Sequence, residues 1–268
     1  MLELKNISKT FFPGTVHEKT ALDNLNLTLN EGDFVTVIGG NGAGKSTMLN
    51  AIAGTFAVDS GSIIIDGKDV TRLPEYKRAT LLGRVFQDPM MGTAPTMQIQ
   101  ENLALAARRG KHRGLKWGIT PQEEKDYYQR LKELDLGLED RMKAKVGLLS
   151  GGQRQALTLM MATFKPPKLL LLDEHTAALD PGTAEKVLRL TREIVEGERL
   201  TCLMITHNMK NALELGNRTL MMDAGRIVFD VKGAARSKMT VDDLLEKFRE
   251  NAGKNLDNDR ILLSKVEK

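Results

Sequence analysis

The sequence predicts an α/β protein that has a mainly parallel core sheet with helices, an antiparallel β portion and an inserted helical portion. Short apolar runs end in polar residues at DFVTVI (33–38), LLLLDE (169–174) and TCLMITH (201–207). Such runs are typical of parallel strands that are buried on both faces. The alternating run ALDNLNLTL (21–29) indicates a half-buried antiparallel strand. Residues 96–165 carry apolar side chains at helical spacing, which predicts the inserted helices.

The N-terminal third is expected to contain strands and one helix. The expected strands are LELKNIS (2–8), ALDNLNLTL (21–29), DFVTVI (33–38), SGSIIIDG (60–67) and GRVFQDP (83–89). A turn is expected around Pro13-Gly14. The helix is expected over Lys45–Ala53, ended by Gly54, because glycine readily takes the left-handed conformation that closes a helix.

Helices and strands are expected to alternate in the rest of the chain. The expected elements are helices over Asn102–Arg109, Glu123–Leu136 and Pro181–Glu196, a short helix after TCLMITH, a hairpin over TLMMDAGRIVFD (219–230) that turns at Ala224-Gly225, and a charged helix with a tail from about Thr240. Asp180 is the expected N-cap of the third helix, with Pro181 at its first position. These patterns predict one domain over 1–235, a helical subdomain inserted at about 90–165, and a helical, charged tail over 236–268.

The composition is that of a globular protein with a sizeable core. Of the 268 residues, 41% are hydrophobic and 28% are charged. The net charge of +4 and the 4% aromatic content give little support to a nucleic-acid-binding surface, and fit equally a protein beside an anionic membrane. The single cysteine, Cys202, cannot form an internal disulfide, so a cytoplasmic location is expected.

Membrane-targeting features are not evident in the sequence. The N-terminal stretch MLELKNISKTFF has no apolar h-region and no small-residue cleavage site, so no signal peptide is expected. No apolar stretch approaches the roughly 18 residues that a membrane helix needs. If the protein acts at a membrane, another chain is expected to supply the span.

A phosphate-binding loop is predicted at GGNGAGKST (39–47). Gly39 to Ser46 matches G-x-x-x-x-G-K-[ST] between a predicted strand and a predicted helix. The glycines let backbone N–H groups approach phosphate oxygens, and the helix N-terminus adds a partial positive charge. Lys45 is expected to reach the β- and γ-phosphates, and Ser46 to bind Mg²⁺. The alternative, a plain glycine-rich turn, is disfavoured by the strand–loop–helix setting.

Two adjacent acids follow the leucine run at 169–172. Asp173 emerges at the carboxyl end of a predicted buried strand, where ligands bind in parallel sheets, and is expected to hold Mg²⁺. Glu174 is expected to point away from Asp173, because neighbours on a strand alternate, and to polarise a water molecule as general base. The alternative is two solvated acids at a strand end, and the phosphate loop makes the metal-site interpretation the stronger one.

A second glycine-rich segment, LSGGQ (149–153), lies between these motifs and leads into a helix. With GGNGAGKST before it and LLLLDE after it, the chain resembles the ATP-binding subunit of ABC transporters over roughly residues 2–232. The resemblance implies the P-loop NTPase fold of the ABC type, and it makes 1–235 the ABC ATP-binding domain. It also implies ATPase activity with ATP and Mg²⁺.

The resemblance assigns roles residue by residue. Phe11 sits where an aromatic ring stacks on adenine, with Phe12 as the alternative, and His207 matches the switch histidine that senses the γ-phosphate. The implied catalytic residues are Glu174, His207, Lys45 and Gln87. The implied nucleotide contacts are Phe11, Gly39, Asn41, Gly42, Gly44, Lys45, Ser46, Thr47, Ser150, Gly151, Gly152 and Gln153. The implied metal contacts are Ser46, Gln87 of the Q-loop and Asp173.

The resemblance also implies partners. Two copies of the chain are expected to pair head to tail, with LSGGQ of one closing over the nucleotide on the phosphate loop of the other. The segment AALD (177–180) is similar to the D-loop, which reaches toward the second copy. The implied partners are integral membrane permease subunits and, for an importer, a substrate-binding protein. The implied location is the inner face of the cell membrane, and no nucleic acid partner is expected.

Three kinds of ABC protein stay open, and a transporter subunit is favoured over a soluble assembly ATPase or a nucleic-acid or ribosome-acting one. DEHTAALDP and the C-terminal tail resemble bacterial ATPases that serve permeases of the branched-chain amino acid or ribose type, some of them tryptophan/tyrosine uptake systems. Uptake of a small solute such as an amino acid is therefore expected. The segment PGTVHEKTALDNLNL resembles lipoprotein-release and macrolide-export ATPases, so an exporter is the alternative.

His175 departs from the family pattern, which has proline after the catalytic glutamate. It could tune Glu174, but the favoured interpretation is that it only begins the next turn. His17 and His112 have no partners at metal-ligand spacing, so no zinc site is expected. The basic loop Arg108 to Lys116 could contact anionic lipid near the permease, although a solvated loop is favoured.

Overall fold

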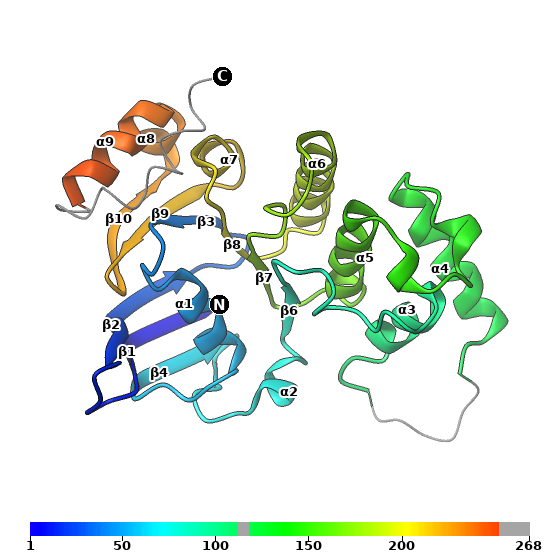
Figure 1. Cartoon of the computed structure of the whole chain (residues 1–268), viewed down its shortest axis with the longest axis horizontal. Helices are drawn as coiled ribbons and strands as arrows, with labels where there is room; N and C mark the ends of the chain where they lie inside the picture. The colour runs from blue at the N-terminus through cyan, green and yellow to red at the C-terminus, as the bar shows by residue number, and fades with distance from the viewer. Residues whose placement is uncertain (112–117, 252–268) are drawn as a thin grey trace. The chain divides into compact units, whose positions relative to one another are not determined.

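The computed structural model describes residues 1–111 and 118–251 (Figure 1). The centre of the predicted basic loop, with His112, and the end of the predicted tail lie outside the described residues. The described residues form two units, one of residues 1–78 and 201–251, and one of residues 79–111 and 118–200. The domain boundaries expected from the sequence stay a prediction.

An antiparallel sheet forms the first part of the first unit (Figure 1). Its strands are β1 (Leu2–Phe11), β2 (Lys19–Leu29), β4 (Ser60–Ile65) and β5 (Lys68–Asp69), in the order β2-β1-β4-β5. Alternate side chains of β2 are buried at Leu25, Leu27 and Leu29. The alternation in the sequence therefore predicted this strand correctly, since one face of the sheet packs on the core.

Parallel strands form the second part of the first unit. They are β3 (Phe34–Gly39), β8 (Cys202–Ile205) and β9 (Arg218–Asp223), with β10 (Arg226–Lys232) antiparallel to β9. β3 pairs in parallel with both β8 and β9, and all its residues are buried. The carboxyl end of a fully buried strand therefore leads directly into the phosphate loop.

Five helices complete the described part of the first unit. They are α1 (Lys45–Ala53), α2 (Glu75–Arg78), α7 (Met209–Glu214), α8 (Gly233–Ser237) and α9 (Val241–Asn251). The bounds of α1 and its Gly54 cap match the prediction, and the predicted helix near Thr240 is confirmed as α9. Leu244, Leu245 and Phe248 of α9 join Ile38 of β3 in one apolar cluster. The short helices α2 and α8 were not predicted.

The second unit combines a parallel strand pair with a helical core (Figure 1). The strands are β6 (Leu82–Val85) and β7 (Leu169–Asp173), and the helices are α3 (Ile99–Ala107), α4 (Pro121–Glu133), α5 (Gly151–Thr163) and α6 (Pro181–Gly197), with 3₁₀ turns at Glu139–Arg141 and Val146–Leu148. Asp180 caps α6 with Pro181 in its first turn, as predicted.

Capping boxes make α3 and α4 begin earlier than the apolar spacing predicted. Glu101 accepts a hydrogen bond from the Gln98 amide at 2.7 Å, so α3 begins at Ile99 rather than Asn102. Glu123 accepts from the Thr120 amide at 2.8 Å in the same way, and α4 begins at Pro121. Each box satisfies backbone donors that a helix N-terminus leaves without partners.

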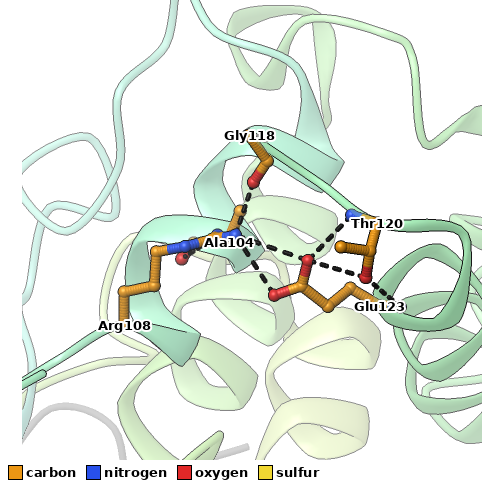
Figure 2. A network of polar contacts seen from close by, with 5 residues as sticks. All are labelled: Ala104, Arg108, Gly118, Thr120 and Glu123. Carbon is orange, nitrogen blue, oxygen red and sulfur yellow. Dashed lines mark hydrogen bonds and ion pairs between the residues drawn. The ribbon is translucent and has the colours of Figure 1, made fainter. Parts of the chain in front are cut away.

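Arg108 joins the end of α3 to the start of α4 (Figure 2). Its guanidinium donates to the carbonyl oxygens of Ala104 at 2.9 Å and Gly118 at 2.5 Å, and pairs with Glu123 at 3.1 Å. Glu123 is thus shared between the helix cap and the ion pair. Arg108 belongs to the predicted basic loop, and its guanidinium binds groups of the protein itself.

Candidate functional site

The phosphate loop connects β3 to α1 and depends on glycine conformation. Gly39, Gly42 and Gly44 have φ angles of 149°, 80° and 98°, which side chains with a Cβ rarely adopt. No side chain caps the N-terminus of α1 at Gly44. The loop therefore offers backbone donors to an anion at the amino end of a helix.

Lys45 is buried at the base of this loop, only 6% exposed. Its Nζ donates to the carbonyl oxygens of Gly39 at 2.7 Å and Gly40 at 2.8 Å. These bonds hold the ammonium group against the loop that is expected to bind phosphate. A buried cation beside backbone donors fits the triphosphate of a nucleotide.

Neighbouring backbone confines the loop. A Cβ on Gly44 would lie 2.5 Å from the Ala21 carbonyl oxygen, and one on Gly39 would lie 2.3 Å from that of Met222. Gly225, in the hairpin turn between β9 and β10, donates its amide to Ala43 O at 3.0 Å. The hairpin turn was predicted, but its hydrogen bond to the phosphate loop was not.

Arg78 holds the other end of α1 and was missed by sequence reasoning. The side chain is 2% exposed, and burial lowers the pKa of its guanidinium. It donates to the carbonyl oxygens of Ala51 at 2.7 Å and Ile52 at 2.9 Å, in the last turn of α1, and also to those of Leu73 and Thr71. A cation at a helix C-terminus is favourable, and the only sequence signal was an arginine in an unassigned segment.

Two aromatic residues lie at the end of β1: Phe11 is its last residue and Phe12 follows it. The Phe11 ring packs edge to face against Phe56, with ring centroids 5.4 Å apart, and Lys9 Nζ lies 5.7 Å from the Phe11 centroid. Phe12 is 65% exposed, with a left-handed φ of 52°. Phe11 is thus the better supported platform for a base, whereas Phe12 is largely exposed.

His207 lies between β8 and α7. The Thr206 amide donates to Val37 O at 3.1 Å, so the backbone before His207 is tied to β3. Asn208 caps α7 by accepting from the Asn211 amide at 3.0 Å. His207 thus lies on a short connection whose backbone is hydrogen-bonded on both sides. Phe11 and the phosphate loop belong to the same unit.

The two acids in the second unit differ in backbone conformation. β7 ends at Asp173, and Glu174 has a φ of 46°. The expectation that the two side chains diverge by strand alternation is therefore wrong in its premise, because Glu174 is not part of the strand. A glutamate in the left-handed region is uncommon, and such strained residues concentrate at functional sites.

Arg84 of β6 faces Asp173 within the parallel pair β6–β7. Its Nη2 lies 4.0 Å from Asp173 Oδ2, and the guanidinium lies 4.4 Å from the centroid of the Phe86 ring. The cation balances the charge of the acid that is expected to hold a metal ion. Asp173, Ser46 and Gln87 all offer oxygen ligands, which suit Mg²⁺. Arg84 was not singled out in the sequence.

Gln87 follows β6 and is exposed. The carbonyl oxygen of the preceding residue, Phe86, accepts from Gln155 Nε2 at 3.3 Å. Gln155 is buried in α5, the helix that LSGGQ begins. The Q-loop and the signature helix are therefore linked directly within the second unit, through a glutamine that sequence reasoning did not identify.

The signature segment forms the N-terminus of α5. Ser150 and Gln153 make a capping box, with Ser150 Oγ accepting from the Gln153 amide at 3.3 Å. Arg154 donates to the carbonyl oxygens of Val146, Gly147 and Leu149, which shapes the preceding turn. Gly151 is exposed and Gly152 is buried. The segment presents backbone amides at a helix N-terminus, as an anion site requires.

Side chains from α6 and the segment before it pack on the signature glycines. A Cβ on Gly152 would lie 1.9 Å from Thr183 Cγ2, and one on Gly151 would lie 3.4 Å from Leu179 Cδ2. Asp180 accepts from the Thr183 amide at 3.0 Å. The predicted D-loop (177–180) and signature motif therefore form one packed region of the second unit.

His175 is buried, and its imidazole Nε2 lies 2.9 Å from the Thr191 hydroxyl of α6. Burial lowers the pKa of His175 to about 4, so the ring is neutral at physiological pH. The interpretation that it only begins a turn is incomplete, because the side chain makes a specific contact.

Among residues 1–111 and 118–251, no helix has both the length and the apolar character needed to cross a bilayer. The family model for ABC transporters matches residues 22–177. The tyrosine transport ATP-binding protein of Clostridioides difficile (strain R20291) is 45% identical over 248 residues, which cover 92% of this chain and 98% of that protein.

A second relative and a solved structure are also ATP-binding proteins of this kind. The methionine import ATP-binding protein MetN of Rhizobium johnstonii is 38% identical over 211 residues, and the match spans 78% of this chain but 56% of that protein. The dimeric, post-hydrolysis structure of the ATP-binding cassette MJ0796 bound to ADP and Pi has a TM-score of 0.74 and 32% identity, covering 87% of this chain and 98% of that one. The fold is therefore the P-loop NTPase fold of the ABC type.

Proposed function

The chain belongs to the ABC transporter family and is an ATP-hydrolysing subunit that powers uptake of a small solute, and we propose that the solute is an amino acid of the tyrosine type. The proposal is supported by the 45% identity to a tyrosine transport ATP-binding protein along almost the full length of both chains. The solute passes through a separate permease of the branched-chain amino acid or ribose type. That permease places this subunit on the inner face of the cell membrane, where a substrate-binding protein delivers the solute from outside.

The phosphate loop is the observation that carries the nucleotide site. Lys45, buried against Gly39 and Gly40, turns from these carbonyl oxygens toward the β- and γ-phosphates of bound ATP. The amides of Gly42, Gly44 and their neighbours, including Asn41 and Thr47, wrap the phosphate chain. Phe11 stacks on the adenine, with Phe56 supporting its edge.

Ser46, Gln87 and Asp173 would hold Mg²⁺ through oxygen atoms, and the ion would neutralise charge that develops on the phosphates. Glu174 accepts a proton from the attacking water as general base, and its left-handed backbone turns the side chain out of the β7 direction. His207 donates a hydrogen bond to the γ-phosphate. Arg84 orients the Asp173 carboxylate between turnovers.

A second copy of the chain completes each site. Ser150 Oγ and the amides of Gly151 and Gly152, at the N-terminus of α5, bind the γ-phosphate held by the partner copy, and Gln153 fixes the cap. Dimer formation on ATP therefore precedes hydrolysis. The dimeric arrangement of the MJ0796 cassette supports this step.

Purified protein tests the nucleotide site. Glu174→Gln is expected to bind ATP, to form a stable dimer in size-exclusion chromatography, and to lose hydrolysis by about 10²–10⁴-fold, the usual contribution of a general base. Ser150→Arg is expected to bind ATP as a monomer without hydrolysing it. Normal turnover by Glu174→Gln would remove the base assignment, and normal turnover by Ser150→Arg would remove the shared site.

Uptake by cells tests the solute. The chain is expressed with its co-purifying membrane subunits, and accumulation of labelled tyrosine is compared with that of labelled methionine and spermidine. ATP-dependent accumulation of tyrosine that Glu174→Gln abolishes is the expected result. Efflux of the label, or preference for another solute, would overturn the proposed substrate and leave the ATPase site intact.

A further inference from the structure

His175 makes one well-defined hydrogen bond across the second unit. Its side chain is 2% exposed, and its Nε2 lies 2.9 Å from Thr191 Oγ1. Thr191 is fully buried in the middle of α6, sixteen residues further along the chain. The bond therefore ties the residue directly after Glu174 to the centre of a long helix.

The hydroxyl of Thr191 defines the tautomer of His175. Thr191 Oγ1 donates its single proton to Val187 O at 2.8 Å, one turn earlier in α6. It can therefore only accept from the imidazole, which must carry its proton on Nε2. The pair is directional, because the imidazole donates to the hydroxyl and the hydroxyl donates to the helix backbone.

The chain around His175 contains a tight turn that begins at Glu174. The Ala177 amide donates to the Glu174 carbonyl oxygen at 2.9 Å, and the Leu179 amide donates to Thr176 O at 3.2 Å. These local bonds shape the turn but do not attach it to the rest of the fold. Within the turn, the His175 side chain is buried and reaches α6.

We propose that His175 is a positioning residue for ATP hydrolysis, which holds Glu174 in its left-handed conformation by hydrogen bonding to Thr191. This inference rests on the proposed role of Glu174 as general base. A left-handed glutamate is costly by itself, and it persists only where the surroundings hold it. The hydrogen bond of the imidazole fixes the Cα of His175. The Glu174–His175 peptide therefore cannot return to the extended conformation of β7.

The geometry explains why a small loss of anchoring reduces the rate. A general base must lie within hydrogen-bond reach of the water it deprotonates, and errors of about 1 Å cost about 100-fold in rate. His175 and Thr191 are not among the residues proposed to contact the nucleotide. Loss of the hydrogen bond is therefore expected to lower kcat and leave KM for ATP nearly unchanged.

Paired substitutions test the proposal in the full-length protein. Thr191→Val removes the hydroxyl at constant shape, and His175→Leu removes the donor; each is expected to lower kcat by about tenfold or more. Thr191→Ser and His175→Gln keep an acceptor and a donor and are expected to restore most of the rate. The double variant His175→Leu/Thr191→Val is expected to be no slower than the slower single variant, because both remove one interaction.

Thr163→Val is the matched control for loss of a buried threonine hydroxyl. Thr163 Oγ1 donates to Leu159 O at 2.9 Å in α5 and has no histidine partner among the hydrogen bonds of the described residues. It is expected to unfold at a somewhat lower temperature while kcat is unchanged. If Thr191→Val folds and keeps the native kcat, or if Thr163→Val lowers kcat equally, the positioning role is wrong.

Measurements in the Glu174→Gln variant distinguish the positioning role of His175 from the general-base role of Glu174. Adding Thr191→Val to Glu174→Gln is expected to slow the residual rate no further, because there is no base left to position. A further tenfold loss in that background would overturn the positioning role. Normal hydrolysis by Glu174→Gln alone would instead overturn the base assignment.

Discussion

The phosphate loop and the signature segment both place glycines at the N-terminus of a helix, but they need glycine for different reasons. In the phosphate loop, Gly44 has a φ of 98° and faces the carbonyl oxygen of Ala21. In the signature segment, Gly152 has ordinary helical backbone and faces the methyl group of Thr183. Gly44 is required because its own φ and the neighbouring main chain exclude a Cβ. Gly152 is required because the Thr183 side chain, which can be substituted, occupies the space of a Cβ.

The difference shows how each region is held. The first unit confines its phosphate loop between main-chain segments of β2, β9 and the hairpin turn at Gly225. In the second unit, side chains of α6 make the corresponding contacts: Thr183 packs on Gly152 of the signature segment, and Thr191 bonds His175, the residue after Glu174. Main-chain confinement cannot be altered by one substitution elsewhere, whereas side-chain contacts can be removed and restored.

Gly44→Ala is expected to have the largest effect. It combines a strained φ with a contact of 2.5 Å to backbone, so unfolding free energy should fall by about 3–4 kcal/mol. Nucleotide affinity should fall below detection in titrations with a fluorescent ATP analogue. Gly67→Ala is the control for φ alone, since Gly67 has a φ of 74° with nothing within 4 Å of its Cβ position, and it should cost only about 1 kcal/mol.

Gly152→Ala is expected to have a smaller and reversible effect. The added Cβ meets Thr183 Cγ2 at 1.9 Å but lies 3.4 Å from Thr183 Cβ. Overpacking of this kind costs about 1–3 kcal/mol. Adding Thr183→Ser removes the methyl group and should recover most of the stability in urea unfolding. Absence of recovery would mean that Gly152 is also limited by backbone.

Features that depend on contiguous residues could be predicted from the sequence. All the strands except the two-residue β5, together with α1 and its Gly54 cap, the start of α6 and the hairpin turn, follow local patterns and were predicted. The phosphate loop could be recognised because its strand, glycines, lysine and helix are contiguous. By contrast, α3 and α4 began early because capping residues, rather than apolar spacing, determine where a helix starts.

Contacts between distant residues could not be predicted. Arg78 bonds Ala51, Gln155 bonds Phe86 and His175 bonds Thr191, across 27, 69 and 16 residues of chain, and nothing local marks these contacts. The direction of Glu174 was argued from strand alternation, and this failed because one residue with a left-handed φ ends the strand. Whether the nucleotide, metal and catalytic residues act as expected stays a prediction for the variants above.

Arg78→Met is expected to cost about 2 kcal/mol, because carbonyl oxygens at the end of α1 lose a buried donor while the aliphatic volume is kept. Arg78 is remote in sequence from the phosphate loop, yet it holds the helix that the loop begins. ATP affinity should therefore fall modestly, by about tenfold or less, the equivalent of about 1.4 kcal/mol. Unchanged melting temperature and unchanged affinity would show that α1 does not need this cap.

Glu123→Gln is expected to have the smallest effect on the free energy of unfolding. It compares the half-buried Arg108, which loses its partner, with the buried Arg78. Glutamine keeps the capping box with Thr120 but removes the charge that pairs with Arg108, whose side chain is 28% exposed. Exposed pairs of this kind contribute about 0.2–1 kcal/mol and weaken with salt. The difference in unfolding free energy should therefore shrink between low and high salt.

Acid titration of the same variant gives an independent measurement. The hydrogen bond from the Thr120 amide, helped by Arg108, lowers the pKa of Glu123 from its usual 4.5. A carboxyl with a lowered folded pKa stabilises the fold above its unfolded pKa, and that contribution is lost as the pH falls through the folded pKa. Below about pH 4.5 the native protein should therefore lose its small advantage over Glu123→Gln. If the difference persists at pH 3 and at high salt, the charge pair of Glu123 with Arg108 is not the source of the stabilisation.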